Sequence, residues 1–252
     1  DPVYGRLTYG TVAEQVERLA AGLRNLDIGP GDRVILQLPN WAPFLVFHLA
    51  LTKIGAVTAA IPIVYREHEL RNVLRLTGAN TVVLPSAYRD HDYAAMAESV
   101  REGWNDPLRI ILVGDGDDTA RPDTLSYESL MKQPWESRSR NTSAPEPGLD
   151  DLTALGFTAG TTGSLKAAMY STRVLSATNA CLQDRFGLNE GDRIFGCSPI
   201  GHAVGFTHAL RMVLTIGGSI VLFDKWDPGR ALEVIEEERC TFMAGATPFL
   251  LD

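Results

Sequence analysis

The order of apolar and polar positions over the first 113 residues predicts short buried strands that alternate with amphipathic helices. Apolar runs bounded by turn residues predict strands over 34–38, 56–61, 81–84 and 110–113. Helical spacing predicts helices over 43–54, 67–77 and 93–102, and an earlier helix from a capping box at 11–14 to the Gly-Pro turn at 29–31. Because parallel strands need long crossover connections, this alternation predicts a mainly parallel sheet.

The alternation resumes after a stretch without regular apolar spacing. Residues 133–150 contain three prolines and a Ser/Arg/Asn/Thr run, which predicts a surface linker. Beyond it, strands are expected over 152–157, 166–170, 192–198, 219–223 and 241–245, and helices over 173–186, 202–214 and 228–238. Asp227-Pro228 offers the last helix an N-cap and a proline at its first position. The prediction is an α/β fold with a first lobe over 1–134, a linker over 135–150 and a second lobe over 151–252.

Composition and charge restrict the function classes. The chain has 252 residues, of which 45% are hydrophobic and 21% charged, as in ordinary folded globular proteins. A formal net charge of −8 gives no electrostatic reason to expect a nucleic acid or an anionic membrane as a partner. The longest apolar stretch, 44–51, is far shorter than the ~20 residues that span a bilayer. Cys181, Cys197 and Cys240 are odd in number and widely spaced, which argues against a disulfide framework or a zinc site and predicts a cytoplasmic protein.

A loop rich in Gly, Thr and Ser follows the predicted strand 152–157 and ends at Lys166. Gly160 and Gly163 allow positive φ and a close approach of the backbone, so successive N–H groups can form an anion-binding nest. Side-chain donors add hydroxyl groups and one ammonium, from Thr158, Thr161, Thr162, Ser164 and Lys166. These residues predict a loop that binds a polyphosphate. The simpler alternative, an exposed polar linker, needs neither the preceding strand nor the lysine.

Two common phosphate-binding patterns do not fit this chain. No segment satisfies the Walker pattern, and Gly114-Asp115-Gly116 lacks the third glycine of the dinucleotide fingerprint. Residues 158–167, TAGTTGSLKA, instead resemble the phosphate loop of the adenylate-forming enzymes, Thr-(Ser/Ala/Gly)-Gly-Thr-Thr-Gly-x-Pro-Lys-Gly. This superfamily includes acyl-CoA synthetases, luciferases and the adenylation domains of peptide synthetases. Leu165 and Ala167 depart from the pattern, and Ser171-Thr172 stands where that family often has Thr-His.

A second motif strengthens the resemblance. Residues 199–205, Pro-Ile-Gly-His-Ala-Val-Gly, are similar to the family's Pro-x-x-His-x-x-Gly motif. Weaker similarities at 7–9, 50–57, 223–228 and 247–248 extend the resemblance along nearly the whole chain. Alone, His202 would be interpreted as a surface residue at a helix start. In combination with the phosphate loop, the resemblance places it beside the acyl substrate and the adenylate.

The resemblance implies the fold of the large N-terminal domain of acyl-CoA synthetases and the activity of an acid–thiol ligase. A carboxylic acid would be activated by ATP as an acyl-adenylate, with release of pyrophosphate, and would then form a thioester with coenzyme A. ATP and Mg²⁺ are the implied cofactors, and coenzyme A is the co-substrate. Lys166 and His202 are the implied catalytic residues, and His202 and Gly205 the implied residues of the acyl pocket. The implied ATP-binding residues are Thr158, Ala159, Gly160, Thr161, Thr162, Gly163, Ser164 and Lys166.

Further motifs of such enzymes are expected beyond Asp252. They are an adenine-binding segment, a Tyr-Gly-x-Thr-Glu motif whose glutamate holds magnesium, a ribose-binding aspartate, and a small C-terminal domain with a catalytic lysine. We therefore expect this chain to be about the first half of an enzyme and to have little or no activity alone. The acceptor thiol, coenzyme A or a carrier protein, stays open, as do the acid, fatty or aromatic, and a homodimer. A non-catalytic, degenerate ATP-binding homologue is the remaining alternative.

The other conspicuous polar residues receive structural interpretations. His48 lies on an apolar helix face and is expected to be a hydrogen-bonded residue of the core or of its boundary. His68 and His91 have charged neighbours and are expected to be exposed, and His208 is not expected to bind a metal. Glu236-Glu237-Glu238 is expected to form a solvated helix face.

Overall fold

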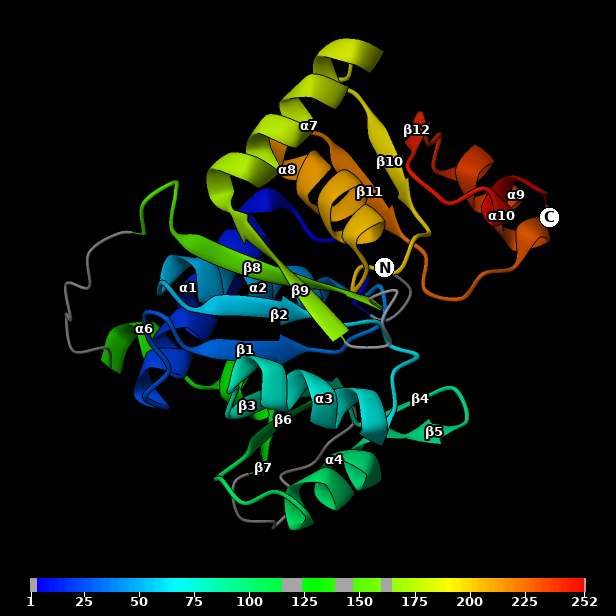
Figure 1. Ribbon diagram of the computed structural model, residues 1–252. Helices are drawn as coiled ribbons and strands as arrows, with labels where there is room; N and C mark the ends of the chain where they lie inside the picture. Colours follow the sequence, from blue (N-terminus) through cyan, green and yellow to red (C-terminus); the bar gives the residue numbers. More distant parts are fainter. Residues whose placement is uncertain (1–3, 115–123, 139–146, 160–164, 252) are drawn as a thin grey trace.

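A mainly parallel sheet of seven strands, called the large sheet below, lies at the centre of the part of the chain that the structure describes (Figure 1). The structure is a computed structural model and describes residues 4–114, 124–138, 147–159 and 165–251. Neighbouring strands follow the order β7 (Thr124–Ser126), β6 (Arg109–Val113), β3 (Thr81–Pro85), β1 (Arg33–Leu36), β2 (Val57–Ala60), β8 (Leu152–Ala159) and β9 (Leu165–Ser171). All neighbours pair in parallel except β8 and β9, which form an antiparallel hairpin.

A smaller parallel sheet, called the small sheet, follows later in the chain. Its central strand β10 (Arg193–Gly196) lies between β11 (Ser219–Leu222) and β12 (Phe242–Met243). A short antiparallel pair, β4 (Ala87–Tyr88) and β5 (His91–Asp92), follows β3. The predicted α/β class with mainly parallel sheets is confirmed.

The predicted start of a second lobe at residue 151 does not coincide with a change of sheet. β8 pairs with β2, with Ala154 opposite Thr58 and Gly156 opposite Ala60, so the large sheet continues past the expected linker. Both faces of β8 are covered, because Ala154 packs into the core on one face and Leu155 packs into the core on the other. An apolar run of this kind shows that a strand is buried but not which sheet it joins. The small sheet begins only with β10.

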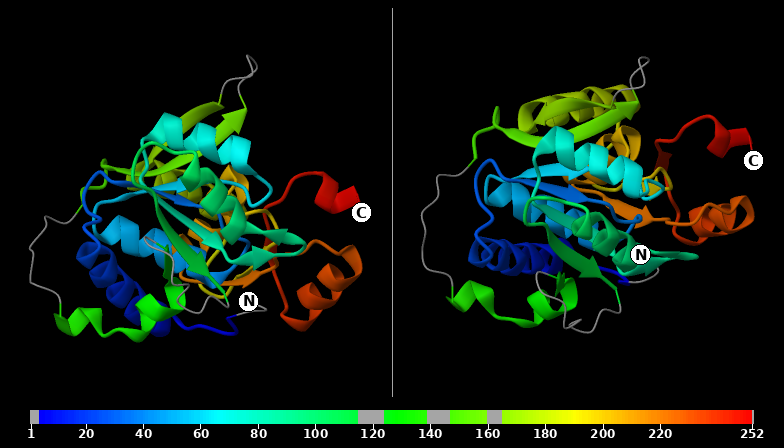
Figure 2. Two further views of the ribbon diagram at one scale, coloured as in Figure 1. Left: turned by 90° about the horizontal axis from the view of Figure 1, so that it is seen from below. Right: turned by 60° about the horizontal axis from the view of Figure 1, so that its bottom comes forward.

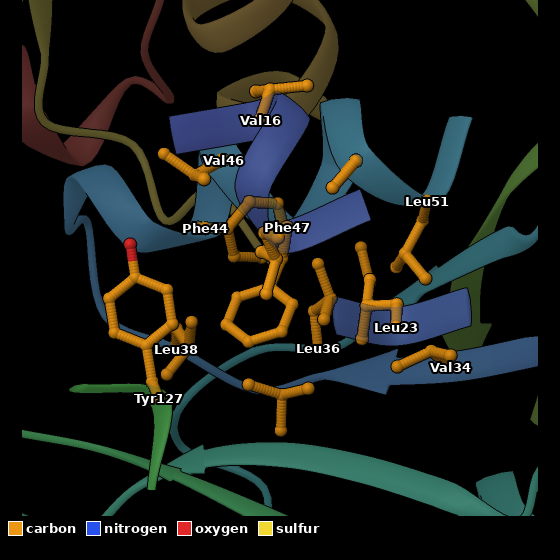
Figure 3. Packing of buried hydrophobic residues seen from close by; sticks show 14 of the residues in the cluster. Val16, Leu23, Val34, Leu36, Leu38, Phe44, Val46, Phe47, Leu51 and Tyr127 are labelled. Atoms are coloured by element: carbon orange, nitrogen blue, oxygen red, sulfur yellow. The ribbon is translucent and has the colours of Figure 1, made fainter. Parts of the chain in front are cut away.

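Helices cover both faces of the large sheet. α1 (Tyr9–Asn25) and α2 (Ala42–Lys53) lie on one face, and α3 (Glu67–Thr77) and α4 (Tyr93–Glu102) lie on the other. Figure 3 shows Phe44, Phe47 and Leu51 of α2 packing with Val34 and Leu36 of β1. This double cover explains why the strands appear in the sequence as continuous apolar runs.

A second set of helices encloses the small sheet. α7 (Thr172–Phe186), the π-helical turn η1 (Val204–Leu210) and α8 (Arg211–Ile216) pack on one face. α9 (Pro228–Glu237) packs on the other face, and α10 (Pro248–Leu251) follows it. Figure 2 shows α9 and the C-terminal segment on the opposite side of the molecule from α6 (Trp135–Arg138). The single helix expected over 202–214 is therefore a π-helical turn that continues as an α-helix.

α9 starts where the sequence predicts, because its N-cap residue was identified correctly. Asp227 caps α9, because its Oδ1 accepts a hydrogen bond of 2.8 Å from the Arg230 backbone N–H. The capping box predicted at 11–14 is wrong. α1 starts earlier, since the Thr8 Oγ1 caps it by accepting from the Thr11 backbone N–H at 3.1 Å. Two threonines three residues apart can each serve as a cap, and local sequence does not choose between them.

The expected linker begins with an ordered segment. α6 follows α5 (Tyr127–Lys132), and the Trp135 indole N–H donates to the Leu130 carbonyl at 3.0 Å. The indole also packs on α1, where a Cβ at Gly22 would lie 2.9 Å from Trp135 Cδ1. One aromatic residue in a polar stretch carries no periodicity, so the sequence pattern missed this contact. Residues 139–146 of the expected linker lie outside the described residues.

We predict that Leu51→Ala lowers the free energy of unfolding by about 2–5 kcal/mol, because Leu51 is 0% exposed and its truncation leaves a cavity in the core between α2 and the large sheet. Leu232→Ala, in α9 with Leu232 71% exposed, should change it by less than about 0.5 kcal/mol. Urea unfolding monitored by circular dichroism measures both. Equal shifts in the two variants would contradict the packing described here.

Candidate functional site

Strand ends from both sheets meet around the side chain of Asn40, which follows β1 and is 5% exposed. Its Nδ2 group donates three hydrogen bonds of 3.0 Å to backbone carbonyls, those of Gly196, Ser198 and Phe223. Its Oδ1 accepts a hydrogen bond of 2.9 Å from the Ile200 backbone N–H. Because an amide has two N–H groups, at least one of them is shared between two carbonyls. Asn40 thus joins the end of β1 to the ends of β10 and β11.

The turn at residues 198–202, which follows β10, is held from two further directions. The Ser198 hydroxyl donates to the Ala244 carbonyl, just past β12, at 2.8 Å. A Cβ at Gly201 would overlap the carbonyl of Ile61, just past β2, so only glycine allows the two backbones to approach this closely. A Cβ at Gly205 would overlap the Pro199 carbonyl. The absence of a side chain at Gly205 is therefore explained by the close packing of its backbone against the 198–202 turn.

His202 ends the 198–202 turn and is exposed. Its backbone N–H donates to the Pro199 carbonyl at 3.0 Å, and its carbonyl accepts from the Phe206 N–H at 2.9 Å. The imidazole has no hydrogen-bond partner among the residues that the structure describes. The backbone of His202 is therefore fixed while its ring is available to a ligand.

Lys166 and Thr158 face each other across the β8–β9 hairpin. Both are exposed, and neither side chain has a hydrogen-bond or ion-pair partner within the described ranges. Leu165 and Ala167, on either side of Lys166, pack into the core of the large sheet. Side chains alternate along a strand, so this packing turns Lys166 to the opposite face. The ammonium group is free to bind an anion.

The predicted site residues belong to different sheets. They lie on the same side of the large sheet, where β2 and β8 end. Thr158 lies near the carboxyl end of β8, and β8 pairs with β2, whose end contacts Gly201 of the 198–202 turn. The carboxyl ends of parallel strands are where open α/β sheets bind ligands. No described hydrogen bond joins Lys166 to His202. Of the predicted phosphate loop, Gly160, Thr161, Thr162, Gly163 and Ser164 lie outside the described residues, as does the side chain of Ala159.

The departures from the family pattern have structural roles in this chain. Leu165 and Ala167 contribute apolar surface to the core around Leu155 and Phe157. Ser171 caps α7, since its hydroxyl accepts from the Val174 N–H at 3.3 Å. Leu165 and Ala167 thus support the hairpin that carries the loop, and Ser171 supports the helix that follows the hairpin.

Asn40 is the site residue that sequence reasoning missed. An asparagine between Pro39 and Trp41 is typical of a turn, and its partners lie more than 150 residues away in the chain. The available signal was its position just after a buried strand, at the edge where such sheets bind ligands.

His48 is a buried, hydrogen-bonded core residue, as predicted. Its Nε2 lies 2.8 Å from Arg211 Nη1, and its Nδ1 lies 2.9 Å from Thr58 Oγ1. Because the guanidinium can only donate, Nε2 accepts and the Nδ1–H donates to Thr58. Burial, and secondly the charge of Arg211, hold the pKa of His48 well below its usual value. The imidazole is therefore a neutral acceptor for a largely buried cation.

Two other expectations need correction. His91 is half-buried, with its ring 4.5 Å from the Tyr93 ring, where exposure was expected. Glu238 does not lie on a solvated face. Its carboxylate bridges Arg6 at 2.6 Å and Arg193 at 3.2 Å. Charge alone did not reveal these partners because they are distant in sequence.

The remaining observations concern thiols, metals and membranes. The three cysteines are free, which confirms that they form no disulfide framework, and burial raises the pKa of the Cys197 thiol to about 11. In the described part of the chain, no group of three His, Cys, Asp or Glu residues could hold a metal ion. No helix in those same ranges combines the length and apolar character needed to cross a bilayer.

A groove of about 670 Å³ lies away from these residues, between the start of α1, α2 and β11. Arg6, Tyr9, Leu45 and Glu238 line it, together with the outer edge of β11. Neither Lys166 nor His202 lines it.

We predict that the free energy of unfolding falls as the pH drops below about 6.5, with up to about 1.4 kcal/mol per pH unit from His48. Below that pH the unfolded chain takes up a proton at His48, whereas the folded chain does not, so the stabilisation present above this pH is lost. His48→Gln should remove this part of the slope, and His68→Gln, at an exposed position, should retain it. Urea titrations at several pH values measure the three slopes. An unchanged slope in His48→Gln would contradict the assignment.

The chain is similar to known proteins over nearly its whole length. A family model described as AMP-binding enzyme matches residues 2–252. The medium-chain fatty-acid–CoA ligase of Escherichia coli is 32% identical over 245 residues, which cover 97% of this chain and 42% of that protein. Feruloyl-CoA synthase of an Amycolatopsis species is 28% identical over 239 residues, which cover 95% of this chain and 43% of that protein. The chain spans about two-fifths of the length of these curated relatives.

A solved structure shows the same fold. The apo structure of MbtA from Mycobacterium smegmatis superposes with a TM-score of 0.79 at 25% identity, covering 98% of this chain and 44% of that one. The family match extends over nearly every residue and includes both motifs around the common strand edge. The chain belongs to the AMP-binding enzyme family.

Proposed function

We propose that the full-length protein activates a carboxylic acid with ATP and transfers the acyl group to coenzyme A. The substrate carboxylate attacks the α-phosphorus of ATP, the bond between the α-phosphorus and the bridging oxygen breaks, and pyrophosphate leaves. The thiol of coenzyme A then attacks the acyl carbonyl, and AMP leaves. The observation that carries the proposal is the unpaired Lys166 ammonium at the strand edge where the His202 turn also lies, in a chain of the AMP-binding enzyme family.

Lys166 and Thr158 fit the polyphosphate part of ATP. The Lys166 ammonium supplies positive charge in a protein of net charge −8, and the Thr158 hydroxyl supplies a donor across the hairpin. Both groups are exposed, so binding a phosphate breaks no ion pair within the described ranges. We assign to them, with Ala159, Gly160, Thr161, Thr162, Gly163 and Ser164, the binding of the β- and γ-phosphates. Their catalytic effect would be stabilisation of the charge that develops on the departing pyrophosphate.

His202 and Gly205 fit the acyl side of the site. The fixed backbone of His202 would hold its ring against the acyl group. Gly205 supports the turn, because any side chain there would overlap the Pro199 carbonyl. The relatives in the comparisons are named for both fatty and aromatic acids, so we leave both acid classes as candidate substrates.

Coenzyme A is favoured over a carrier protein because the curated relatives compared above are coenzyme A ligases or a coenzyme A ester synthase. Magnesium would neutralise phosphate charge when bound. No cluster of metal ligands occurs in the ranges that the structure describes, so we derive no step through the ion. The cytoplasm stays our expected compartment, on the ground of the three free thiols.

Pyrophosphate–ATP exchange by the full-length protein tests the proposal. We expect exchange that depends on one or more acids from a panel of fatty and aromatic carboxylic acids. Measurable ATP binding without exchange for any acid would favour the non-catalytic homologue instead. The thiol acceptor is then tested by comparing coenzyme A with a carrier-protein phosphopantetheine thiol.

We predict that Lys166→Ala in the full-length protein slows exchange by a factor of about 30 to 1,000, equivalent to about 2–4 kcal/mol. The loss arises because one preorganised charge no longer stabilises the departing pyrophosphate. Lys132→Ala, which removes an exposed lysine in α5, is the control and should exchange at the wild-type rate. An unchanged rate in Lys166→Ala would remove Lys166 from the mechanism.

A further inference from the structure

The Asn40 side chain makes four hydrogen bonds, yet the proposed chemistry uses none of its atoms. All four partners are backbone groups. Three belong to the segment that runs from the end of β10 into the 198–202 turn, and one is the Phe223 carbonyl after β11. The Asn40 side-chain amide therefore constrains the course of the backbone after β10 and β11.

That path leads directly to His202. Asn40 fixes the N–H of Ile200, two residues before His202. The His202 carbonyl accepts from Phe206, in η1, at 2.9 Å. Short π-helical segments within α-helices are frequent at functional sites. The His202 backbone is thus held between the Asn40 amide on one side and the π-helical turn on the other.

The contact at Gly201 restricts the turn further. Gly201 is buried and its backbone lies directly on the Ile61 carbonyl, so the turn cannot move toward β2. The Asn40 bonds oppose movement of the turn away from Asn40. The turn can be displaced only if these bonds lengthen or break.

We propose that Asn40 is a positioning residue, which fixes the 198–202 turn so that the His202 ring faces the acyl substrate. This role rests on the function proposed above. Asn40 touches neither substrate nor reacting atoms and acts through His202. The competing explanation is that Asn40 stabilises the fold in general, with no separate effect on the acyl group.

Hydrogen exchange at the turn provides the first test, and it does not depend on activity. In the wild-type full-length protein, the Ile200 amide should exchange as slowly as the amides of β10. Asn40→Ser, whose single shorter hydroxyl cannot reach three carbonyls, should speed exchange at 197–202 without speeding it in β1 and β3. An Ile200 amide that exchanges in the wild type at the rate of an open turn would overturn the proposal, whether or not any variant folds.

Leu51→Ala is the control for a general loss of stability. Figure 3 shows Leu51 near Val34, at the start of β1. Leu38, which is only two residues before Asn40, lies just beyond the other end of this strand. This variant should speed amide exchange across the large sheet, with no larger effect at the 198–202 turn than elsewhere. The same exchange pattern in Asn40→Ser and Leu51→Ala would show that Asn40 stabilises the fold only.

A double-mutant cycle of Asn40→Ser and His202→Ala gives the second test. In the full-length protein, Asn40→Ser should raise the KM for the carboxylic acid by a factor on the order of ten, with the KM for ATP changed less than about twofold. In the His202→Ala background, Asn40→Ser should have no further effect on the KM for the acid, because the group that it positions is absent. Equal effects of Asn40→Ser in both backgrounds would overturn the proposal.

Failure of the proposed function has a different result. A wild-type protein that shows no exchange of pyrophosphate with any acid would overturn the acyl role of His202, and with it the acyl part of this proposal. The hydrogen-exchange measurement would still decide whether Asn40 fixes the turn.

Discussion

Four of the hydrogen bonds that relate the two sheets to each other come from the buried amide of Asn40. The sheets share no strand, and what lies between them is largely an apolar layer of helix and strand side chains. Hydrophobic burial is non-directional, so such a layer holds two bodies together without fixing how they are oriented. Hydrogen bonds are directional. Those of Asn40 connect the end of β1 with the ends of β10 and β11, which fixes one edge of the small sheet against one edge of the large sheet.

This arrangement matters because the two predicted motifs lie on different sheets. The phosphate-loop motif is carried by the β8–β9 hairpin of the large sheet, and the His202 motif follows the central strand of the small sheet. Neither motif can form a joint site unless the sheets keep their relative position. The contact of Gly201 with the Ile61 carbonyl brings the small-sheet turn to the strand that pairs with β8. Because β8 pairs in parallel with β2, the carboxyl ends of these two strands lie on the same side of the large sheet.

The basic side chains of the described residues differ in whether they are paired. Arg6 and Arg193 are bound to Glu238, and Arg211 is bound to the neutral ring of His48, so these cations serve the structure. Lys166, in contrast, has no partner within the described ranges. In an acidic protein, an anionic ligand needs a local source of positive charge. In the function proposed above, Lys166 would supply it without breaking an ion pair.

The sequence by itself determined the α/β class, most element positions, and the two motifs. Periodicity placed α3 and α4 at their observed bounds, and Asp227-Pro228 gave the start of α9, because these signals depend on residues a few positions apart. The tertiary structure alone decided that β8 and β9 extend the large sheet, that Trp135 packs on α1, and that Glu238 is bridged by two arginines. It also decided that Asn40 controls the His202 turn. These features join residues far apart in the chain, and a local pattern shows that a residue will be buried or paired but not which distant partner it will meet.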